Sequence, residues 1–147
     1  MSVRASGFLR CARRELVQGQ SYAGYDPAQI QKLIFLFQER GLATGSPKPF
    51  TFKPHNFGPF DPSVYSVLER LSEDGMVEIV GQPYSKQRCY RLSESGTKSA
   101  NAALASFPEA EYLKQLSEWV RKQSFRSLVA AVYKAFPAMK VNSVFRD

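Results

Sequence analysis

The chain has 147 residues and a formal net charge of +7 at pH 7. Apolar residues make up 44% and aromatic residues 13%, which excludes a disordered polar tail and allows a self-standing core. No apolar run approaches the roughly 20 residues of a membrane span, and the N-terminus lacks the apolar stretch and cleavage site of a secretory signal. These features predict a single cytoplasmic domain that has no membrane partner.

The two cysteines, Cys11 and Cys89, lie far apart in the sequence. In a chain without a secretory signal we expect reduced thiols rather than a disulfide. Zinc sites use four ligands, or three and a water, whereas this chain has one histidine, His55, and no C-x-x-C motif. We therefore expect no metal and no other cofactor.

The positive charge is unevenly distributed along the chain. Residues 1–25 carry four arginines and one glutamate, a net charge of +3. Residues 26–80 have a net charge of −2, whereas residues 81–107 and 108–147 have +3 each. A local excess of Lys and Arg attracts phosphate groups, although the same excess also serves general solubility.

The N-terminal third predicts two helices. Residues 2–18 have an amphipathic helical pattern, and a loop through Tyr25 follows. Asp26 and Pro27 are typical of a helix start, and Gly41 is typical of its end. This second helix is apolar nearly all round, which predicts that it is buried at the centre of the fold. Its apolar stripe consists of Ile30, Leu33, Ile34 and Phe37.

The middle of the chain predicts a helix, a β-hairpin and a second helix. A loop at 42–49, a strand at 50–52 and an aromatic turn at 55–60 lead to a helix that begins at Asp61-Pro62 and ends at Gly75. Strands at 76–80 and 88–92 then flank a polar loop at 81–87. Ser93 is a suitable cap for the next helix. The inner face of that helix should contain Ala100, Ala103 and Leu104.

Two more helices are predicted near the C-terminus. The first begins after Pro108, and the second runs from Phe125 to Phe136 and stops at Pro137. The tail at 138–147 has no assigned structure. Its apolar side chains suggest that it packs against the rest of the protein, and they are Val141, Val144 and Phe145.

Together these elements predict a mainly α, α+β fold, a modified winged helix with a small β-hairpin wing over residues 61–104 and extra helices at both ends. We expect one domain over 1–147, divided into a basic N-terminal arm at 1–25, a winged-helix-like core at 26–107 and a C-terminal helical extension at 108–147.

Catalysis has little support in the sequence. A hydrolase triad needs a histidine, and the aromatic neighbours of His55 favour a packed or capping role. No Walker or G-x-G-x-x-G motif is present to hold phosphates. The carboxylates of Glu69, Glu73 and Asp74 are best read as an exposed acidic helix face. We therefore expect no catalytic residues and no enzyme activity.

Nucleic-acid binding is better supported, because the hairpin and the arm collect basic side chains, with Tyr84 at the hairpin tip. The alternative is that they are simply solvated surface charges. The candidate phosphate ligands are Lys86, Arg88, Arg91, Lys98, Arg10, Arg13 and Arg14. However, the helix that should enter the DNA groove has four acidic residues against Arg70 alone, and its N-terminal half has no side chain that pairs bidentately with guanine. Those acidic residues are Asp61, Glu69, Glu73 and Asp74.

The aromatic turn has two interpretations. Its rings either anchor the start of the following helix in the core or form an edge that binds another protein. The candidate protein-contact residues are Phe57, Phe60 and Tyr65. The last helix could likewise be core on one side and a homodimer face on the other.

Several short motifs over residues 27–105 resemble the Panacea-type, antitoxin-associated domain and its relatives of unassigned function. The motifs are Lys32-Leu33-Ile34-Phe35-Leu36, Phe50-Thr51-Phe52, Phe57-Gly58-Pro59-Phe60, Leu68 with Leu71, Asp74-Gly75-Met76-Val77 and Tyr90-Arg91-Leu92-Ser93-Glu94-Ser95-Gly96. The last motif is also similar to the Y-x-L-T-x-x-G exit from the wing in winged-helix regulators, with Ser93 in place of Thr. The resemblance implies antitoxin action, in some members by protein contact as adaptors or toxin neutralisers, and it implies no catalytic residues.

Two functions follow as hypotheses. The first is a winged-helix protein that binds double-stranded DNA as a transcriptional regulator or antitoxin-like component. The alternative is a non-catalytic protein-binding module, a toxin neutraliser or adaptor, on the same scaffold.

Overall fold

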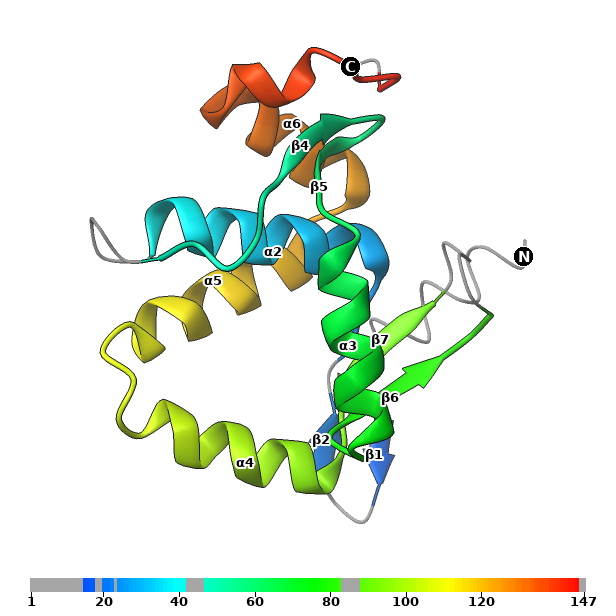
Figure 1. Cartoon of the computed structure of the whole chain (residues 1–147), viewed down its shortest axis with the longest axis vertical. Coiled ribbons are helices and arrows are strands. Elements are labelled where there is room, and N and C mark those ends of the chain that lie inside the picture. The colour runs from blue at the N-terminus through cyan, green and yellow to red at the C-terminus, as the bar shows by residue number, and fades with distance from the viewer. Residues whose placement is uncertain (1–14, 18–19, 23, 42–46, 83–87, 146–147) are drawn as a thin grey trace. The chain divides into compact units, whose positions relative to one another are not determined.

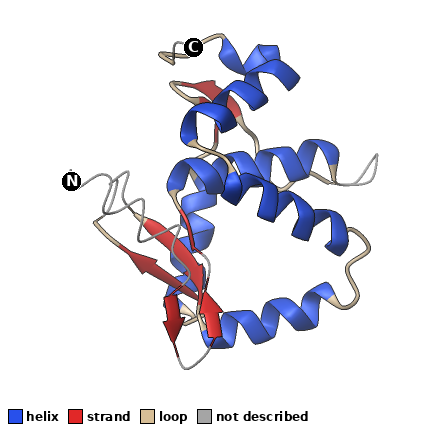
Figure 2. Ribbon diagram, turned by 180° about the vertical axis from the view of Figure 1, so that it is seen from behind, coloured by secondary structure: helices blue, strands red, loops and turns tan. Residues whose placement is uncertain are grey.

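α-Helices form most of the regular structure, and short antiparallel strands form the rest, as predicted for a mainly α, α+β fold (Figures 1 and 2). The computed structural model describes residues 24–41, 47–82 and 88–145, and the backbone alone of 15–17 and 20–22. The helices are α2 (Pro27–Arg40), α3 (Ser63–Glu73), α4 (Glu94–Leu104), α5 (Ala110–Lys122) and α6 (Phe125–Ala135), followed by the 3₁₀ helix η1 (Pro137–Lys140).

The strands pair only in antiparallel fashion. They are β1 (Glu15–Val17), β2 (Gln20–Tyr22), β3 (Gly24–Tyr25), β4 (Lys53–His55), β5 (Gly58–Phe60), β6 (Val77–Val80) and β7 (Cys89–Leu92). β1 pairs with β2, and β4 pairs with β5. The third sheet has the order β3-β7-β6, so that the predicted hairpin gains a third strand from near the N-terminus.

The chain divides into two compact units, which we describe separately. Unit 1 comprises residues 1–27 and 65–107, and unit 2 comprises residues 28–64 and 108–147. Two of these breaks lie near the boundaries expected at 25 and 107. The third break, between Val64 and Tyr65, lies within α3 and inside the predicted core.

In unit 2, α2 is buried on nearly all sides, as its apolar sequence predicted. Phe35 is only 2% exposed and meets two other rings edge-on, Phe52 at 5.4 Å and Phe136 at 4.9 Å between centroids. Polar side chains of the helix are buried as well, which the apolar stripe did not predict. They are Gln29, Gln31, Lys32 and Gln38.

Two of these buried polar side chains hold the segment that leads to α3. The Gln31 amide donates to the carbonyl of Asp61 at 2.9 Å and accepts from its N–H at 3.0 Å. The Gln38 amide makes the same pair of bonds with Phe50, at 2.7 and 3.0 Å. The amide O and N of each glutamine are thus both used, so burial leaves neither unsatisfied.

The predicted strand at 50–52 is therefore wrong, because Gln38 already takes the N–H and the carbonyl of Phe50 that a ladder would need. The strand forms three residues later, as β4, and pairs Pro54 with Pro59. Neither proline removes a bond from a central strand, since this sheet has only two strands. The predicted aromatic turn at 55–60 is correspondingly the turn and second strand of this hairpin.

α6 supplies the second half of the unit 2 core, and the C-terminal tail packs near it. Leu128, Val129 and Val132 are each 1% exposed or less. Phe145 packs with Val129 and Tyr133, and the N–H of Val144 donates to the carbonyl of Asn56 at 2.9 Å. Packing of the tail is thus confirmed for Phe145, whereas the side chains of Val141 and Val144 are exposed.

In unit 1, the predicted hairpin and Ser93 cap are confirmed. β6 pairs with β7 in the register that puts Glu78 opposite Arg91 and Ile79 opposite Tyr90. The Ser93 hydroxyl accepts from the Gly96 N–H at 3.0 Å and donates to the Gly75 carbonyl at 2.5 Å. This cap fixes the start of α4 against the start of β6.

Other expectations for unit 1 are wrong. Residues 15–17 form strand β1, not the end of a helix. The expected loop at 19–25 contains β2 and β3. The apolar residues near Leu16 also fit a short strand, and this strand has its partner at 20–22. The rest of the predicted N-terminal helix lies outside the described residues. Cys89 is disulfide-bonded rather than a reduced thiol, and the other cysteine, Cys11, also lies outside them. On α4, Ala100 and Leu104 are half-buried, but Ala103 is exposed.

The carboxylate of Asp61 makes a pH-dependent contribution to stability. Burial raises its pKa, but hydrogen bonds from Ser63 and from the Thr51 N–H, together with the charge of Lys53, lower it further, so that the pKa lies below its usual 3.8. A lowered pKa means that the ionised form stabilises the fold above the usual pKa and that this contribution disappears as the pH falls through the folded-state pKa.

We expect Asp61→Asn to lower the free energy of unfolding by about 1–2 kcal/mol at pH 7, because donors from Ser63 and Thr51 lose an ionised acceptor. The difference from wild type should shrink as the pH falls below about 4. Denaturant unfolding over this pH range measures it, with Asp74→Asn, an exposed carboxylate, as the control. A difference that is independent of pH would contradict the assignment.

Gly96 should be intolerant of any side chain. A β-carbon there would overlap the carbonyl oxygen of Met76, although the residue lies in a helix. Gly→Ala in a helix normally stabilises by about 0.5–1 kcal/mol. We expect Gly96→Ala to destabilise by about 2–3 kcal/mol instead, since backbone must shift to admit the methyl group. Thermal unfolding of this variant beside the exposed Ser99→Ala in the same helix checks the sign.

Candidate functional site

The predicted phosphate ligands of the hairpin lie on a sheet whose middle strand is β7. Tyr90 on β7 is 4% exposed, and Tyr65 of α3 stacks on it with centroids 6.1 Å apart and planes 11° apart. This contact places α3 against the Tyr90 face of the sheet. Burial raises the pKa of the Tyr90 hydroxyl above its usual 10.0, and the nearby charge of Arg88 offsets part of that rise.

Arg88 lies between this sheet face and α3. Its Nη2 contacts Oε1 of Glu69 at 2.6 Å, and its guanidinium carbon is 5.6 Å from the Tyr90 ring centroid. The side chain is only 12% exposed, and its buried Nε has no hydrogen-bond partner among the described residues. The cation is therefore held by a carboxylate of the helix and does not extend into solvent.

Arg91 belongs to the opposite face of the same strand. Side chains alternate along a strand, so Arg91 points away from the face that carries Tyr90. Its Nε contacts Oε2 of Glu78, the residue directly opposite on β6, at 2.8 Å. The structure thus does not combine Arg88 and Arg91 into one cationic surface.

The other predicted basic residues are more exposed or not described. Lys98 is 79% exposed in its side chain and lies 3.8 Å from the Glu94 carboxylate one turn earlier in α4. The remaining predicted ligands lie outside the described residues, as does Tyr84. They are Lys86, Arg10, Arg13 and Arg14.

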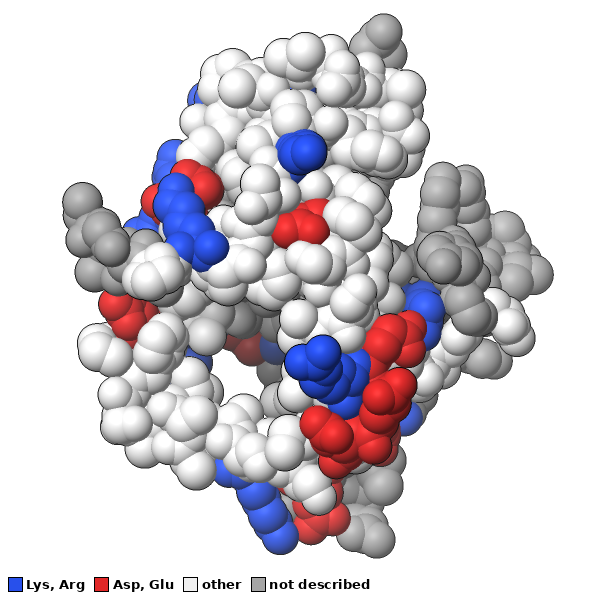
Figure 3. All heavy atoms as spheres, viewed as in Figure 1, with Lys and Arg blue, Asp and Glu red and all other residues white. Residues whose placement is uncertain are grey.

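Exposed carboxylates gather over the C-terminal half of α3 and over β6, as Figure 3 shows. We call the α3 surface the acidic face, and it comprises Glu69, Glu73 and Asp74, all exposed; Glu78 is exposed on β6, on the sheet face of Arg91. Val67 on α3 is 44% exposed, and Arg70 is the one basic residue of the helix. Asp61 was expected among these acidic residues, but it is buried and bonded to Ser63 and Thr51.

Glu69 and Glu78 were not recognised as partners of the hairpin arginines. Glu69 lies 19 residues from Arg88 in sequence, so no short-range pattern connects them. Glu78 could have been found by pairing the two strands residue by residue, because opposite charges on facing positions are favourable. That step requires the hairpin register, which depends on the loop geometry.

The predicted protein-contact aromatics are half-buried and contact their neighbours. The Phe57 ring meets Phe125 edge-on at 5.2 Å, and Phe60 stacks on the exposed His55 at 4.7 Å between centroids. Tyr65 stacks on Tyr90 as described above and also donates to the carbonyl of Pro27 at 3.4 Å. These contacts favour a packing role for all three rings. Along the apolar stripe of α6, Leu128, Val129, Val132 and Tyr133 are buried and Phe125 is 41% exposed; a homodimer face stays a prediction.

Among the described residues, no three His, Cys, Asp or Glu side chains lie together as metal ligands would. None of the described helices is long and apolar enough to cross a membrane. Comparisons with protein-family models, with curated proteins and with solved structures find no match. The resemblance to Panacea-type domains therefore stays a prediction.

The pairing of Arg88 with Glu69 can be measured as a coupling energy. We expect a double-mutant cycle of Arg88→Ala and Glu69→Ala to give about 0.5–1 kcal/mol in the free energy of unfolding, because Glu69 is half-exposed and screened. The control cycle combines Arg88→Ala with Glu73→Ala, the next carboxylate along the same helix. Equal couplings in the two cycles would show that Arg88 has no preferred partner.

Proposed function

We propose that this protein is a non-catalytic protein-binding module, of the toxin-neutraliser or adaptor kind, on a winged-helix-like scaffold. The observation that carries the proposal is the state of the two described hairpin arginines. Arg88 is paired with Glu69, and Arg91 with Glu78. A wing that binds phosphate needs such cations directed to solvent, and here carboxylates of the protein already occupy them.

The charge balance of the helix and hairpin supports the same reading. Residues 65–92 contain four acidic and four basic side chains, which makes this stretch neutral. DNA affinity comes largely from the counterions that an excess of Lys and Arg displaces. A neutral helix and hairpin supply no such excess, and the exposed carboxylates of Glu73 and Asp74 would repel phosphates that came within a Debye length, about 8 Å at physiological salt.

The scaffold itself is supported by the order of its elements. α3 precedes the β6–β7 hairpin, α4 follows it, and β3 extends the hairpin to a three-stranded sheet. The acidic face is the surface that we assign to the partner, and Val67 of the same helix is also exposed. Its charge favours a basic partner surface, because complementary potentials speed encounter and disfavour wrong partners.

A regulator that binds DNA, as a monomer or a homodimer, is the second candidate. The observation that favours it is the net charge of +7, of which +3 belongs to residues 1–25. In that case the arm, with Arg10, Arg13 and Arg14, and the hairpin residue Lys86 would supply the phosphate contacts rather than the paired arginines.

The two candidates predict opposite results in a DNA-binding assay. Under the proposed function, wild type binds its own promoter duplex no more tightly than a random duplex, with Kd in the non-specific range of about 10⁻⁴–10⁻⁶ M. Glu69→Gln combined with Glu78→Gln should bind DNA more tightly, because it releases Arg88 and Arg91. Fluorescence anisotropy over a salt series measures both.

The matched control removes two other ion-paired carboxylates, Glu39 and Glu118, by the same Glu→Gln change. It alters the net charge equally but leaves the hairpin arginines paired, so its DNA affinity should rise less. Tight, promoter-specific binding by wild type that Arg88→Ala weakens would instead establish the DNA-binding candidate. The partner assay uses Glu73→Lys with Asp74→Lys, which should abolish co-purification of a protein partner.

A further inference from the structure

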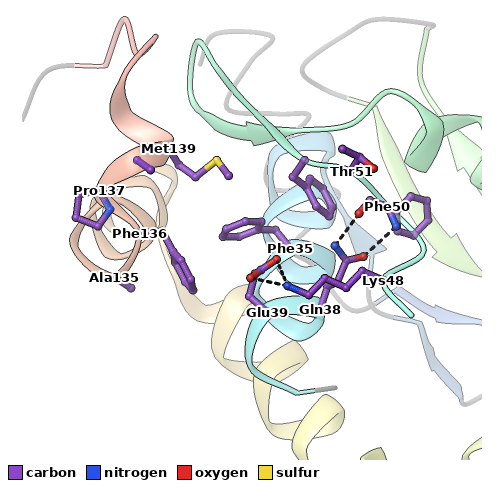
Figure 4. A pocket seen from close by; sticks show the side chains of 12 residues that line it. Phe35, Gln38, Glu39, Lys48, Phe50, Thr51, Ala135, Phe136, Pro137 and Met139 are labelled. Carbon is purple, nitrogen blue, oxygen red and sulfur yellow. Dashed lines mark hydrogen bonds and ion pairs between the residues drawn. The ribbon is translucent and has the colours of Figure 1, made fainter. Parts of the chain in front are cut away.

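Unit 2 contains an open pocket of about 570 Å³ that the proposed function does not use. Its walls come from α2, from the segment at 48–52 and from the end of α6 with η1 (Figure 4). No lining residue belongs to the acidic face of unit 1. A volume of this size accommodates a large side chain together with its neighbours in a bound segment.

Aromatic rings form the apolar part of the pocket. Phe35 lies at its centre in Figure 4, with Phe136 to one side. Phe52 meets Phe35 edge-on at 5.4 Å, and Phe50 lies 6.1 Å from Phe52. Met139 adds a flexible thioether, a group that adapts to varied apolar partners. Phe35 itself is buried, whereas Phe50, Phe52 and Phe136 are only half-buried, so an apolar ligand that covers these three rings is stabilised.

The pocket is held in shape before any ligand binds. Two hydrogen bonds between the side-chain amide of Gln38 and the backbone of Phe50 fix the wall at 48–52, and Gln38 itself is buried. At the mouth, Lys48 contacts both carboxylate oxygens of Glu39 at 3.0 Å. A preformed site loses less conformational entropy on binding, which raises affinity for a given contact area.

The charge around the pocket indicates the chemistry of the ligand. The Arg40 guanidinium lies 5.2 Å from the ring of Phe136, and Lys48 is at the mouth. Lys134 and Lys140 are exposed and adjacent in sequence to the lining residues Ala135 and Met139. The cations beside the lining thus number four, of which Lys48 is paired with Glu39, against two carboxylates, those of Glu39 and of Asp61, which accepts from the Thr51 N–H.

We infer that this pocket binds an acidic peptide segment of another protein, with one aromatic or large aliphatic side chain inserted among the rings and Asp or Glu residues beside it. The half-buried rings account for the inserted side chain, and the excess of cations over carboxylates beside the lining accounts for the flanking acids. A central anchor in a pocket with a charged rim is the usual anatomy of a peptide-binding hot spot.

The test selects a displayed library of random short peptides on the full chain and follows binding of the synthetic winners by NMR of ¹³C-labelled methionine methyl groups. Met139 lines the pocket, and Met76 in unit 1 serves as an internal reference. Enriched peptides should share an apolar anchor next to Asp or Glu. They should shift the Met139 signal and leave that of Met76 in place.

Two variants connect binding to the pocket. Ala138→Trp fills the pocket from an exposed rim position and should weaken the winners by about tenfold or more, whereas Ala102→Trp, at an exposed position on α4, should not. Lys48→Glu should weaken them more than Lys98→Glu does. Thermal unfolding of each variant verifies that it folds.

Three outcomes would overturn the inference. The first is the absence of any enriched peptide. The second is a set of selected peptides that bind Ala138→Trp as tightly as wild type or leave the Met139 signal unshifted. The third is a Met139 shift caused by phenylacetate but by no peptide, which would make this a small-molecule site. None of these outcomes bears on the acidic face, whose partner is tested separately by Glu73→Lys with Asp74→Lys.

Discussion

Two glutamine side chains of α2 hold the segment on which the layout of unit 2 depends. Gln31 and Gln38 lie two helical turns apart, and each replaces a strand partner by binding both the N–H and the carbonyl of one residue, Asp61 and Phe50 respectively. Burial makes these bonds decisive, because an unsatisfied buried polar group costs about 1–3 kcal/mol. The segment from Phe50 to Asp61 is thereby fixed at both ends. Within it, the Thr51 N–H donates a hydrogen bond to the Asp61 carboxylate. The pocket wall and the start of α3 therefore both depend on polar groups inside an apolar helix.

In unit 1, too, a nearly buried polar group requires a partner within the protein. Arg88 is nearly buried against Tyr90 and α3, where an unpaired guanidinium would be strongly unfavourable. Glu69 neutralises it, and the helix thereby acquires a carboxylate that a DNA-reading helix would avoid. Arg91 finds Glu78 across the ladder for a different reason, since facing positions of opposite charge attract. Structural pairing is thus sufficient to account for both arginines without any external phosphate.

The sequence predicted the elements that have local signals. α2 begins at the proline of Asp26-Pro27, α3 follows Asp61-Pro62, α4 follows the Ser93 cap, and the hairpin has turn residues between two apolar runs. The sequence did not predict the features that depend on a partner residue distant in the chain. Phe50 has a good strand sequence, but Gln38, twelve residues away, takes its backbone. Gln31 and Gln38 look like solvent-facing residues of an amphipathic helix, and nothing local shows that they are buried. The basic residues of the hairpin were found, but their carboxylate partners were not, since those depend on register and on the packing of α3.

The position of positive charge therefore matters more than its total. A net charge of +7 suggests nucleic acid, yet residues 65–92 are neutral. Electrostatic potentials at physiological salt decay over about 8 Å, so cations of the N-terminal and C-terminal segments contribute to a surface only where they lie near it. In unit 2 part of the excess lies beside an apolar pocket, where we infer that it favours acidic ligands. In unit 1 an acidic surface covers the helix that would have to enter a DNA groove. Unit 2 thus carries most of the net positive charge, +5 against +2 for unit 1, whose acidic face lies on α3. Under the proposed function, this distribution suits contacts with proteins better than binding of DNA phosphates.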